Sequence, residues 1–528
     1  MMEKKRILEG FFIFLIGFFI FSANIWGISI YSLDEAKNAE CAREMLERSD
    51  LIVPTFNYEL RTDKPPVHYY FMMLAYKMFG VNEFSARFFS SIFGGLLVLI
   101  TFLFAKRYFG FYTAFFSFLV LISSIHMAVQ FHMAVPDPYL IFWINASLFS
   151  FFVWYKERKD IFLYSFYIFS GLGVLTKGPV AVVLPFFIVA SFLALKREIS
   201  FKTLKELKII RGLLIILIIA LPWYVAVGLK TNWKWVEEFI FKHNIHRFSQ
   251  PMEGHGGIFL ITFLYVFIGL LPFSVFIPQA VYRAFNERKN DTFLFLLLIA
   301  GIYTGFFAIS KTKLPNYTVP VYPSLAIIIG YFISSIKNKV PKSVIWSGIF
   351  YLILSIFLVL LLYVGIKGEK EISDLSYLAF FFFILTFGGI LFLLLLKRDW
   401  YVSVLSLSLT SILTSILFFF YIFPKVDKRN PVVQMMPFID KAKPIRYYMS
   451  FNPAFVFYIR KHIKPLKKEE IRKFLYQKET VYILSRDKYK KDILKYKRVF
   501  LLKRVKDLFE NKISILVSNR NIDIGEKK

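Results

Sequence analysis

A series of long apolar runs, which recurs through about the first 420 residues, limits the folds open to this chain more than any other feature. A run of about 18 residues or more is long enough to cross a hydrocarbon layer roughly 30 Å thick as a helix. Hydrophobic residues make up 57% of the chain and aromatic residues 20%, which is more than a soluble surface could hide. The sequence therefore predicts an all-α polytopic membrane protein.

Charged breaks between the apolar runs divide this region into about thirteen predicted transmembrane helices. They cover residues 8–29, 84–105, 112–131, 138–155, 161–176, 178–195, 209–229, 257–280, 292–309, 317–336, 343–364, 377–396 and 400–422. Segments 34–48 and 66–80 are amphipathic or too short to span, so we expect them to be helices lying at the membrane surface. The predicted transmembrane domain is 1–423, with these external loop helices at about 34–80.

Basic residues in the short loops predict how the helices are oriented. If the N-terminus is cytoplasmic, the basic loops all fall on the cytoplasmic side, as positive-inside sorting requires. These loops are residues 106–107, 156–160, 196–211, 283–289, 337–342 and 397–398. The outer segments are then residues 31–83, 131–138, 230–256 and 310–316, together with the C-terminal tail. An odd number of spans places the two termini on opposite sides.

The tail after Pro424 differs from the rest of the chain. From Lys425 onward it holds 28 Lys and Arg against 11 Asp and Glu, so it carries +17 of the net charge of +30. Short β-branched and aromatic runs alternate with Lys-rich helical stretches, which predicts a small soluble α/β domain at 424–528. The predicted strands are 445–449, 454–459, 480–484, 499–502 and 513–517. Its charge favours attraction to anionic lipid headgroups, and no nucleic-acid partner is expected outside the cell.

Four groups of ionisable residues on the predicted outer side carry the candidate chemistry, because charges at a membrane are costly and indicate function. They are Asp34, Glu35, Lys37, Asp63 and Lys64 of the first loop; Asp137; His243, His246 and Arg247; and Lys311, Lys313 and Tyr317. Prolines on both sides of Asp137 fix the backbone there and hold its carboxylate in one direction. Outer cations oppose the positive-inside rule, so they predict an anionic substrate such as a lipid phosphate.

These residues also have structural interpretations. Asp34 and Glu35 could cap the helix that follows them, and Asp137 could be a turn residue. Anchoring at lipid headgroups is the alternative for Arg247, Lys311 and Lys313. We interpret Lys177 and Glu253 as structural.

A metal site is a further open interpretation, and we expect no cofactor with certainty. The residues that could hold a divalent metal are His243, His246 and His255, with Asp34 or Asp63. Their spacing matches no specific zinc signature, so we assign no metal ligands.

A set of motifs resembles those of the bacterial aminoarabinose transferases of lipid A, a family related to the protein O-mannosyltransferases. In chain order they read DEAKNAECAREM from Asp34, DKPP from Asp63, PDP from Pro136, TKGP from Thr176, HRF from His246 and SKTKLPNYTVPVYPSLA from Ser310. The resemblance implies the GT-C membrane fold, with thirteen spans and a small C-terminal periplasmic α/β domain. It also implies inverting transfer of a sugar from a polyprenyl-phosphate carrier, undecaprenyl phosphate, without a nucleotide.

The resemblance assigns expected roles by position. Asp34 and Asp137 match the catalytic acids, Lys64 and Arg247 match ligands of the carrier phosphate, and Tyr317 matches a tyrosine near that phosphate. The remaining candidates for substrate binding are Lys37, Lys311, Lys313, Glu35, Asp63 and His246. Two positions depart from the family, which usually has Arg where this chain has Lys37 and Glu where it has Asp63. Because Lys offers no bidentate fork, the departure puts the role of Lys37 in question.

The expected function is glycosyl transfer in the bacterial inner membrane, with the active site and C-terminus periplasmic and the N-terminus cytoplasmic. The sugar is expected to be aminoarabinose or a related pentose or hexose, and the acceptor lipid A or another envelope glycan or protein. If the acceptor group is a hydroxyl, Asp34 could take its proton, whereas a phosphate acceptor needs no strong base. The alternatives are a protein O-mannosyltransferase-like enzyme, a transporter or flippase of anionic lipid-linked sugars, and a non-catalytic lipid-binding protein.

Overall fold

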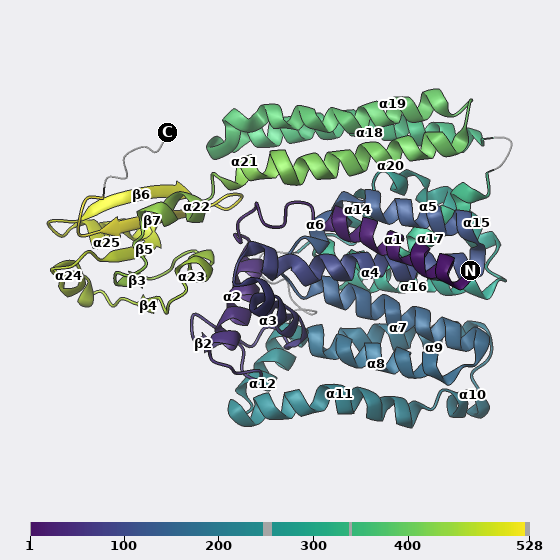
Figure 1. Ribbon diagram of the computed structural model, residues 1–528, viewed down its shortest axis with the longest axis horizontal. Coiled ribbons are helices and arrows are strands. Elements are labelled where there is room, and N and C mark those ends of the chain that lie inside the picture. Colours follow the sequence, from purple (N-terminus) through teal and green to yellow (C-terminus); the bar gives the residue numbers. More distant parts are fainter. Residues whose placement is uncertain (1, 247–255, 337–339, 523–528) are drawn as a thin grey trace.

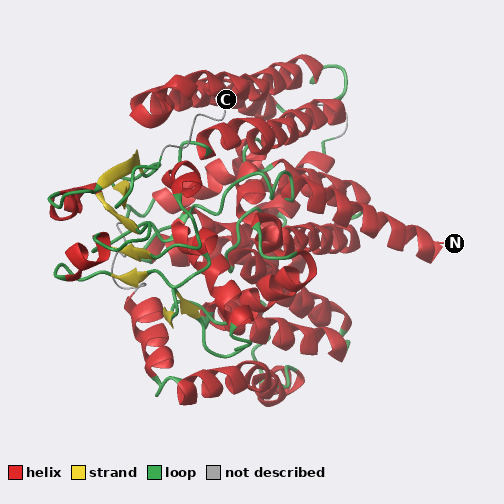
Figure 2. Ribbon diagram, turned by 60° about the vertical axis from the view of Figure 1, so that its left-hand side comes forward, coloured by secondary structure: helices red, strands yellow, loops and turns green. Residues whose placement is uncertain are grey.

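The computed structural model describes residues 2–246, 256–336 and 340–522. Long helices run side by side through most of the molecule, and a small sheet domain projects from one end of this bundle (Figure 1). Helices α18, α19 and α20 form a layer along one side of the bundle, and α11 lies along the opposite side. Strands are confined to the end that carries the C-terminal domain (Figure 2). The molecule is therefore a helical bundle with one α/β domain at its end.

The bundle contains helices from both halves of the chain. Its first half comprises α1 (Met2–Phe21), α4 (Glu83–Phe109), α5 (Phe111–Ser123), α6 (Ile125–Phe131), α7 (Asp137–Glu157), α8 (Asp160–Lys177), α9 (Val180–Leu195), α10 (Phe201–Glu206) and α11 (Ile209–Lys230). Its second half comprises α14 (Ile261–Gly269), η2 (Phe273–Phe276), α15 (Ile277–Asn286), α16 (Asp291–Ile309), η3 (Pro315–Val321), α17 (Tyr322–Ser334), α18 (Lys342–Gly368), η4 (Lys370–Phe382), α19 (Phe383–Leu395), α20 (Trp400–Leu417), η5 (Phe418–Ile422) and α21 (Phe423–Asp427).

The chain is a multi-pass membrane protein. Among the described residues, eight helices are long and apolar enough to cross a bilayer, or up to ten if two bent helix pairs each count as one span. Two shorter apolar helices, Ile7–Phe21 and Val180–Leu195, add to these. Each segment predicted to span overlaps a helix or a bent pair, although the first, residues 8–29, extends beyond the end of α1 at Phe21, and the total of thirteen stays a prediction.

The two bent pairs meet inside the bundle. Helices α5 and α6 are bent by 68°, and α14 is bent by 114° against the segment that contains α15. At these breaks the Ser124 hydroxyl donates a hydrogen bond to the carbonyl of Gly269. The Nδ1 atom of His126 lies 2.7 Å from the Tyr322 hydroxyl. Side chains thus satisfy polar groups where the helices are interrupted, as a bilayer interior requires.

The loop between α1 and α4 folds into two helices, as predicted, α2 (Leu33–Glu47) and α3 (Val67–Phe79); its position outside the membrane stays a prediction. The Ser32 hydroxyl accepts from the Glu35 amide and caps α2, whose first turn also holds Asp34. Helix α3 begins directly after Pro65 and Pro66, where proline suits a helix start. A short hairpin of β1 (Thr55–Phe56) and β2 (Glu59–Leu60) joins them. After α11 the chain forms α12 (Lys234–Ile240) and η1 (Phe241–His246).

The C-terminal domain contains a five-stranded sheet in the order β4-β3-β5-β7-β6. Its strands are β3 (Ile445–Tyr447), β4 (Lys464–Pro465), β5 (Tyr482–Arg486), β6 (Phe500–Lys506) and β7 (Ile513–Ser518). The sheet is mixed, because β3 pairs in parallel with β4 and β5, whereas β7 is antiparallel to β5 and β6. Its helices are α22 (Pro431–Met435), η6 (Met436–Phe438), α23 (Ala454–Ile459), α24 (Glu470–Leu475), η7 (Asp487–Tyr489) and α25 (Lys490–Leu494). The boundary at residues 423 and 424 stays a prediction.

One strand prediction was wrong: residues 454–459 form helix α23. The Asn452 side chain accepts from the Ala454 amide at the start of this helix, and Arg460 ends it with a φ of 57°. The helix is buried on almost every side, so its apolar residues do not alternate with polar ones at the spacing of a helix. The sequence pattern therefore could not distinguish a helix from a strand here. The other four predicted strands are confirmed as β3, β5, β6 and β7, and the short edge strand β4 was not predicted.

Specific hydrogen bonds hold the C-terminal domain against the first external loop. Tyr458 on α23 donates to Glu83 and accepts from the Ile30 amide, at 2.9 and 2.7 Å. Asn57 in the β1–β2 turn exchanges two bonds with the backbone of Ile463, at 3.0 and 2.9 Å. These bonds join the C-terminal domain to the segment between α1 and α4.

Candidate active site

A cavity of about 600 Å³ lies within the bundle, and we call it the bundle cavity. Its apolar walls come from α7, α9, α12, η1, α16 and η3. They are lined by Leu140, Ile141, Ile144, Val180, Val183, Leu184, Phe239, Ile240, Ile245, Tyr303, Phe306, Phe307 and Pro320. Its polar lining comes from Asp63, Lys64, Asp137, Lys177, His243, Asn244, Ser310, Asn316 and Tyr317. Five segments that are far apart in the sequence thus contribute charged or polar groups to one apolar chamber.

Asp137 and Lys177 form an ion pair in this cavity. Asp137 is the first residue of α7, between its two prolines, and Lys177 is the last residue of α8. The Lys177 ammonium donates to Oδ1 of Asp137 at 2.6 Å, and the Asn316 amide donates to the same oxygen at 2.9 Å. The ammonium also lies 5.0 Å from the centre of the Tyr317 ring. Groups from two other segments of the chain therefore fix the direction of the Lys177 ammonium.

Asp63 is the second acid of the cavity. Its carboxylate lies 3.3 Å from Nη2 of Arg61 and 3.0 Å from Nε2 of His243. Burial alone would raise the pKa of this carboxyl. The positive charges around it lower the pKa on balance, and they belong to Arg61, His243, Lys64 and Lys37. Asp63 is therefore held as a carboxylate, and Lys37 lies close enough to contribute to this.

Arg61 lies behind Asp63 and is only 5% exposed. Its Nη2 atom donates to Asn38 on α2 at 3.3 Å, but its Nε and Nη1 atoms are buried with no hydrogen-bond partner in the described part of the chain. Burial alone would lower the pKa of this guanidinium. Neighbouring groups raise the pKa on balance, and they are Tyr69, Asp63, Cys41 and Asp34. Asp34 is itself exposed in the first turn of α2, so its carboxylate faces solvent beside this charged cluster.

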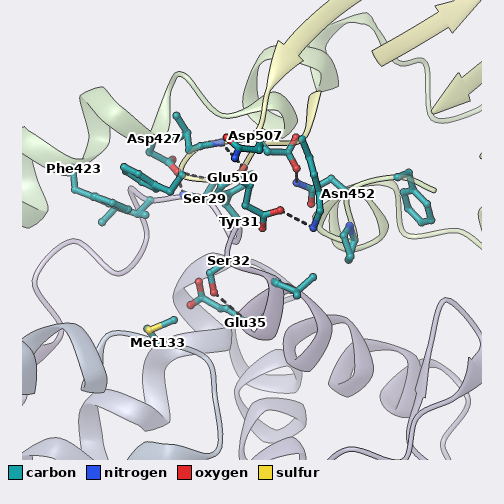
Figure 3. A pocket seen from close by; sticks show the side chains of 18 of the residues that line it. Ser29, Tyr31, Ser32, Glu35, Met133, Phe423, Asp427, Asn452, Asp507 and Glu510 are labelled. Carbon is teal, nitrogen blue, oxygen red and sulfur yellow. Dashed lines mark hydrogen bonds and ion pairs between the residues drawn. The ribbon is translucent and has the colours of Figure 1, made fainter. Parts of the chain in front are cut away.

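A second and larger cavity of about 970 Å³ lies between the bundle and the C-terminal domain, and we call it the interface cavity. Figure 3 shows Ser32 and Glu35 of the first loop on one side, with Asn452, Asp507 and Glu510 of the C-terminal domain opposite. Leu33 and Glu35, on either side of Asp34, both line this cavity. The start of α2 therefore borders the interface cavity, while the charge of Asp34 acts on Arg61, next to the bundle cavity.

A buried ion pair lies in the lining of the interface cavity. Glu35 accepts from Nε and Nη2 of Arg87 at 2.7 and 2.9 Å, and it also accepts from the Ala134 amide at 2.9 Å. Glu35 thereby joins α2, α4 and the loop before α7. Glu35 was expected to bind substrate; it lines the interface cavity and is bound to Arg87, and its part in substrate binding stays a prediction.

Several other candidates lie away from the bundle cavity. Lys311 and His246 are exposed and do not line it. The buried Lys313 ammonium donates to the carbonyls of Ala308 and Ser310, both at 2.7 Å, so it caps the end of α16. Arg247, with Glu253 and His255, lies outside the described residues.

Lys313→Met is expected to lower the free energy of unfolding by about 1–2 kcal/mol, because two buried carbonyls lose a charged donor. Donor affinity should stay unchanged, since Lys313 contacts the backbone and not the cavity. Thermal unfolding in detergent and a titration with undecaprenyl phosphate would measure the two effects. Lys311→Met, the exposed neighbour, is the matched control. A loss of affinity in Lys313→Met at unchanged stability would contradict the capping role.

Sequence reasoning missed three residues that lie in or beside the two cavities. Lys177 was interpreted as structural, yet its ammonium lies in the bundle cavity; its TKGP motif was a signal that could have found it. Arg61 was overlooked, although an arginine two residues before Asp63 is another outer cation. Arg87 lies inside a predicted span, where a charge is itself a signal. A metal remains unassigned: no cluster of three or more His, Cys, Asp or Glu occurs in the ranges that the structure describes.

Comparisons with known proteins agree on one family. A family model described as dolichyl-phosphate-mannose-protein mannosyltransferase matches residues 63–225. An undecaprenyl phosphate-alpha-4-amino-4-deoxy-L-arabinose arabinosyl transferase of Aeromonas hydrophila is 28% identical over 395 residues, 71% of each chain. The crystal structure of ArnT from Cupriavidus metallidurans bound to undecaprenyl phosphate matches with a TM-score of 0.83 over 98% of both chains, at 19% identity. The chain belongs to this family of GT-C membrane glycosyltransferases.

Membership of the GT-C family confirms the resemblance seen in the motifs and the predicted fold class. An uncharacterized protein of Aquifex aeolicus is 30% identical over 343 residues, which are 65% of this chain and 66% of that relative. The GT-C assignment favours the glycosyltransferase prediction over the transporter and lipid-binding alternatives, because its relatives are named as transferases.

Proposed function

We propose that this chain transfers a sugar from a polyprenyl-phosphate carrier, undecaprenyl phosphate, to an envelope acceptor such as lipid A. The sugar is aminoarabinose or a related pentose or hexose. The observation that carries the proposal is the bundle cavity, where an apolar chamber ends in fixed cations. A polyprenyl phosphate has the same division between a long apolar chain and a charged head. The similar ArnT structure is described as bound to undecaprenyl phosphate, which supports the same occupant.

The cavity residues divide the work of binding the donor. The prenyl chain lies along the apolar walls of α7, α9 and α16, where burial of each CH₂ contributes about 0.8 kcal/mol. The donor phosphate lies against Lys64 and Lys177, and Arg247 is the third proposed cation. The ring of Tyr317 contacts the Lys177 ammonium at the same end of the cavity.

During transfer, Lys64 and Lys177 stabilise the negative charge of the leaving phosphate. The bond between the anomeric carbon and the phosphate oxygen breaks, and negative charge grows on the phosphate. Lys64 and Lys177 are already fixed in a low-dielectric cavity, so they need no reorganisation to meet this charge. Asp137 is proposed to act through Lys177, which it positions. Asp34 is proposed to take the proton of the attacking group or to orient the sugar.

Localisation is proposed from the charge of the loops. Basic loops favour a bacterial inner membrane protein with a cytoplasmic N-terminus and a periplasmic C-terminus. The active site is then periplasmic, where lipid-linked sugars and envelope acceptors meet.

The experiment uses the full chain in nanodiscs with undecaprenyl phosphate-linked aminoarabinose and lipid A. We expect mass spectrometry to detect a new sugar mass on the acceptor and free undecaprenyl phosphate in equal amount. A parallel reaction with undecaprenyl phosphate-linked hexose tests the sugar. If neither donor loses its sugar, the proposed function is wrong.

Lys177→Met is expected to raise the donor KM about tenfold with a smaller change in kcat, because one charge-assisted bond to the phosphate contributes roughly 1.5 kcal/mol. Steady-state kinetics at saturating acceptor would measure this split. Lys177→Arg, which keeps the charge, should recover part of the affinity. An unchanged KM in Lys177→Met would show that this ammonium does not contact the donor.

A further inference from the structure

A third cavity, of about 270 Å³, opens on the C-terminal domain, and we call it the basic cavity. It lies at the first residues of the parallel strands β3 and β4 and at the segments that precede them. Its polar lining is Lys443, Arg446, Lys461, His462 and Lys464, and no Asp or Glu of the described residues lines it. A concave surface lined by charges of one sign attracts ions of the opposite sign.

The sheet itself brings two of these cations together. The register of β3 and β4 places Arg446 directly opposite Lys464. Like charges on opposed residues of neighbouring strands destabilise a sheet. Arg446 has one acidic neighbour in the described ranges, Glu470, with 3.4 Å between Nη1 and Oε2, and both side chains are at least a third exposed. An anion bound beside Arg446 and Lys464 would remove their repulsion.

The lysines of the basic cavity keep their charge available for a ligand. Lys443 and Lys464 have no acidic side chain within ion-pair distance among the residues that the structure describes. The Lys461 ammonium donates to the carbonyl of Lys441 at 2.6 Å, so a neutral group holds it and its charge is not cancelled. Lys and Pro on an edge strand prevent pairing with another chain, and this role would account for β4. It does not account for Lys443 and Lys461, which lie outside the strands.

The backbone that carries these cations is fixed. Asn57 exchanges two hydrogen bonds with the backbone of Ile463, at 3.0 and 2.9 Å, and Ile463 is fully buried. The centre of the His462 ring lies 5.6 Å from that of Tyr58. The segment from the end of α23 to β4 is therefore held against the β1–β2 hairpin. A site whose groups are already ordered loses less conformational entropy when a ligand binds.

The position of the basic cavity indicates where its ligand comes from. Figure 1 shows β3 and β4 beyond α2 and α3 and farther than these helices from the bundle. The ligand is therefore expected in the aqueous space outside the membrane. A phosphate group fits the charge, because it accepts charge-assisted hydrogen bonds from several ammonium groups and from a planar guanidinium. A water molecule occupies about 30 Å³ in the liquid, so this cavity has room for a phosphate and part of the group that carries it.

We propose that the basic cavity binds the phosphate group of a water-soluble molecule, with Lys443, Arg446 and Lys464 as its ligands. The site is separate from the bundle cavity, to which the proposed function assigns the carrier phosphate. It gives the C-terminal domain a binding role of its own. Loss of this site leaves sugar transfer intact, so the two assignments can fail independently.

Isothermal titration calorimetry of the full chain in phosphatidylcholine nanodiscs tests the site, with undecaprenyl phosphate added first to fill the bundle cavity. The probes are inorganic phosphate and glucose 6-phosphate, and glucose is the uncharged comparison. We expect saturable binding of a phosphate probe and none of glucose. Tighter binding of glucose 6-phosphate would assign the ligand to phosphate esters, and equal binding would assign it to free phosphate. Absence of saturable binding of both phosphate probes would overturn the proposal.

A double variant tests the location. Lys443→Ala combined with Lys464→Ala is expected to weaken phosphate binding about tenfold or more, because two charged donors are lost. Lys473→Ala combined with Lys478→Ala is the matched control, since it removes the same charge from exposed positions of the same domain outside the cavity lining. The control should bind phosphate like the unchanged protein, and both double variants should keep the rate of sugar transfer.

Two results would contradict this location and this source. Equal weakening in the two double variants would show a general attraction to a basic surface and would overturn the site. Binding to vesicles of phosphatidylglycerol, without binding of either soluble phosphate probe, would overturn the water-soluble source.

Discussion

Asp34→Asn is expected to lower the rate of sugar transfer by about 10³-fold, with expression, thermal stability and donor affinity close to those of the unchanged protein. The reason is that a positioned base contributes roughly 10²–10⁴-fold to a rate, and Asn cannot accept the proton of a hydroxyl. Folding should tolerate the change because Asp34 is exposed, and helix α2 keeps its Ser32 cap. Single-turnover transfer at saturating donor and acceptor would measure the effect.

A matched control for this variant lies in the same external loop. Glu59→Gln removes an exposed carboxylate from strand β2 and should leave the rate unchanged. A rate for Asp34→Asn within a few-fold of the unchanged protein would remove Asp34 from the proton transfer. It would also favour a phosphate as the acceptor group, since a phosphate needs no base.

Lys64→Met is expected to weaken binding of undecaprenyl phosphate and to lower kcat/KM by about 10²–10³-fold. Lys64 is only 9% exposed, lies in the bundle cavity and is followed by two prolines that hold its backbone. A fixed ammonium in a low-dielectric chamber stabilises the leaving phosphate far more than a mobile surface lysine would. Native mass spectrometry with undecaprenyl phosphate would measure the affinity, and steady-state transfer the rate.

Lys311 provides the matched control for Lys64→Met. Lys311→Met removes an exposed lysine that does not line the bundle cavity. The affinity of this variant for undecaprenyl phosphate should therefore match that of the unchanged protein. Equal affinities in Lys64→Met and Lys311→Met would mean that the phosphate is bound elsewhere.

Much of the fold could be predicted because the sequence patterns that indicate helices and strands involve only residues close together in the chain. Apolar length located the bundle helices, and the same criterion kept α3 out of the spans. Alternation and turn residues located β5, β6 and β7. The rule failed at residues 454–459, where a short apolar run is buried all round in α23 and its period says nothing about helix or strand.

The candidate site was predicted in part. Lys64, Asp137, Asp63 and Tyr317 line one cavity, although 253 positions separate Lys64 from Tyr317 in the sequence. Lys313 could not be separated from Lys311 by sequence, because only the fold decides which ammonium turns back to cap α16.

Ion pairs between residues that are far apart in the sequence could not be predicted from the sequence. The sequence placed Glu35 among the site acids, but only the structure shows that Arg87, 52 residues away, binds both of its oxygens. Lys177 looked structural until its ammonium was found on Asp137, 40 residues away. Which charges neutralise each other depends on tertiary packing, and this decides which charges remain for a ligand.

The central claim is that residues from distant loops form one phosphate site at the polar end of the bundle cavity. Its most direct test is an electron cryomicroscopy structure of the full chain in nanodiscs with undecaprenyl phosphate. The account predicts prenyl density along α7, α9 and α16, with the phosphate within hydrogen-bonding distance of Lys64 and Lys177. Density for the phosphate in the interface cavity, or at the membrane surface away from both lysines, would contradict it.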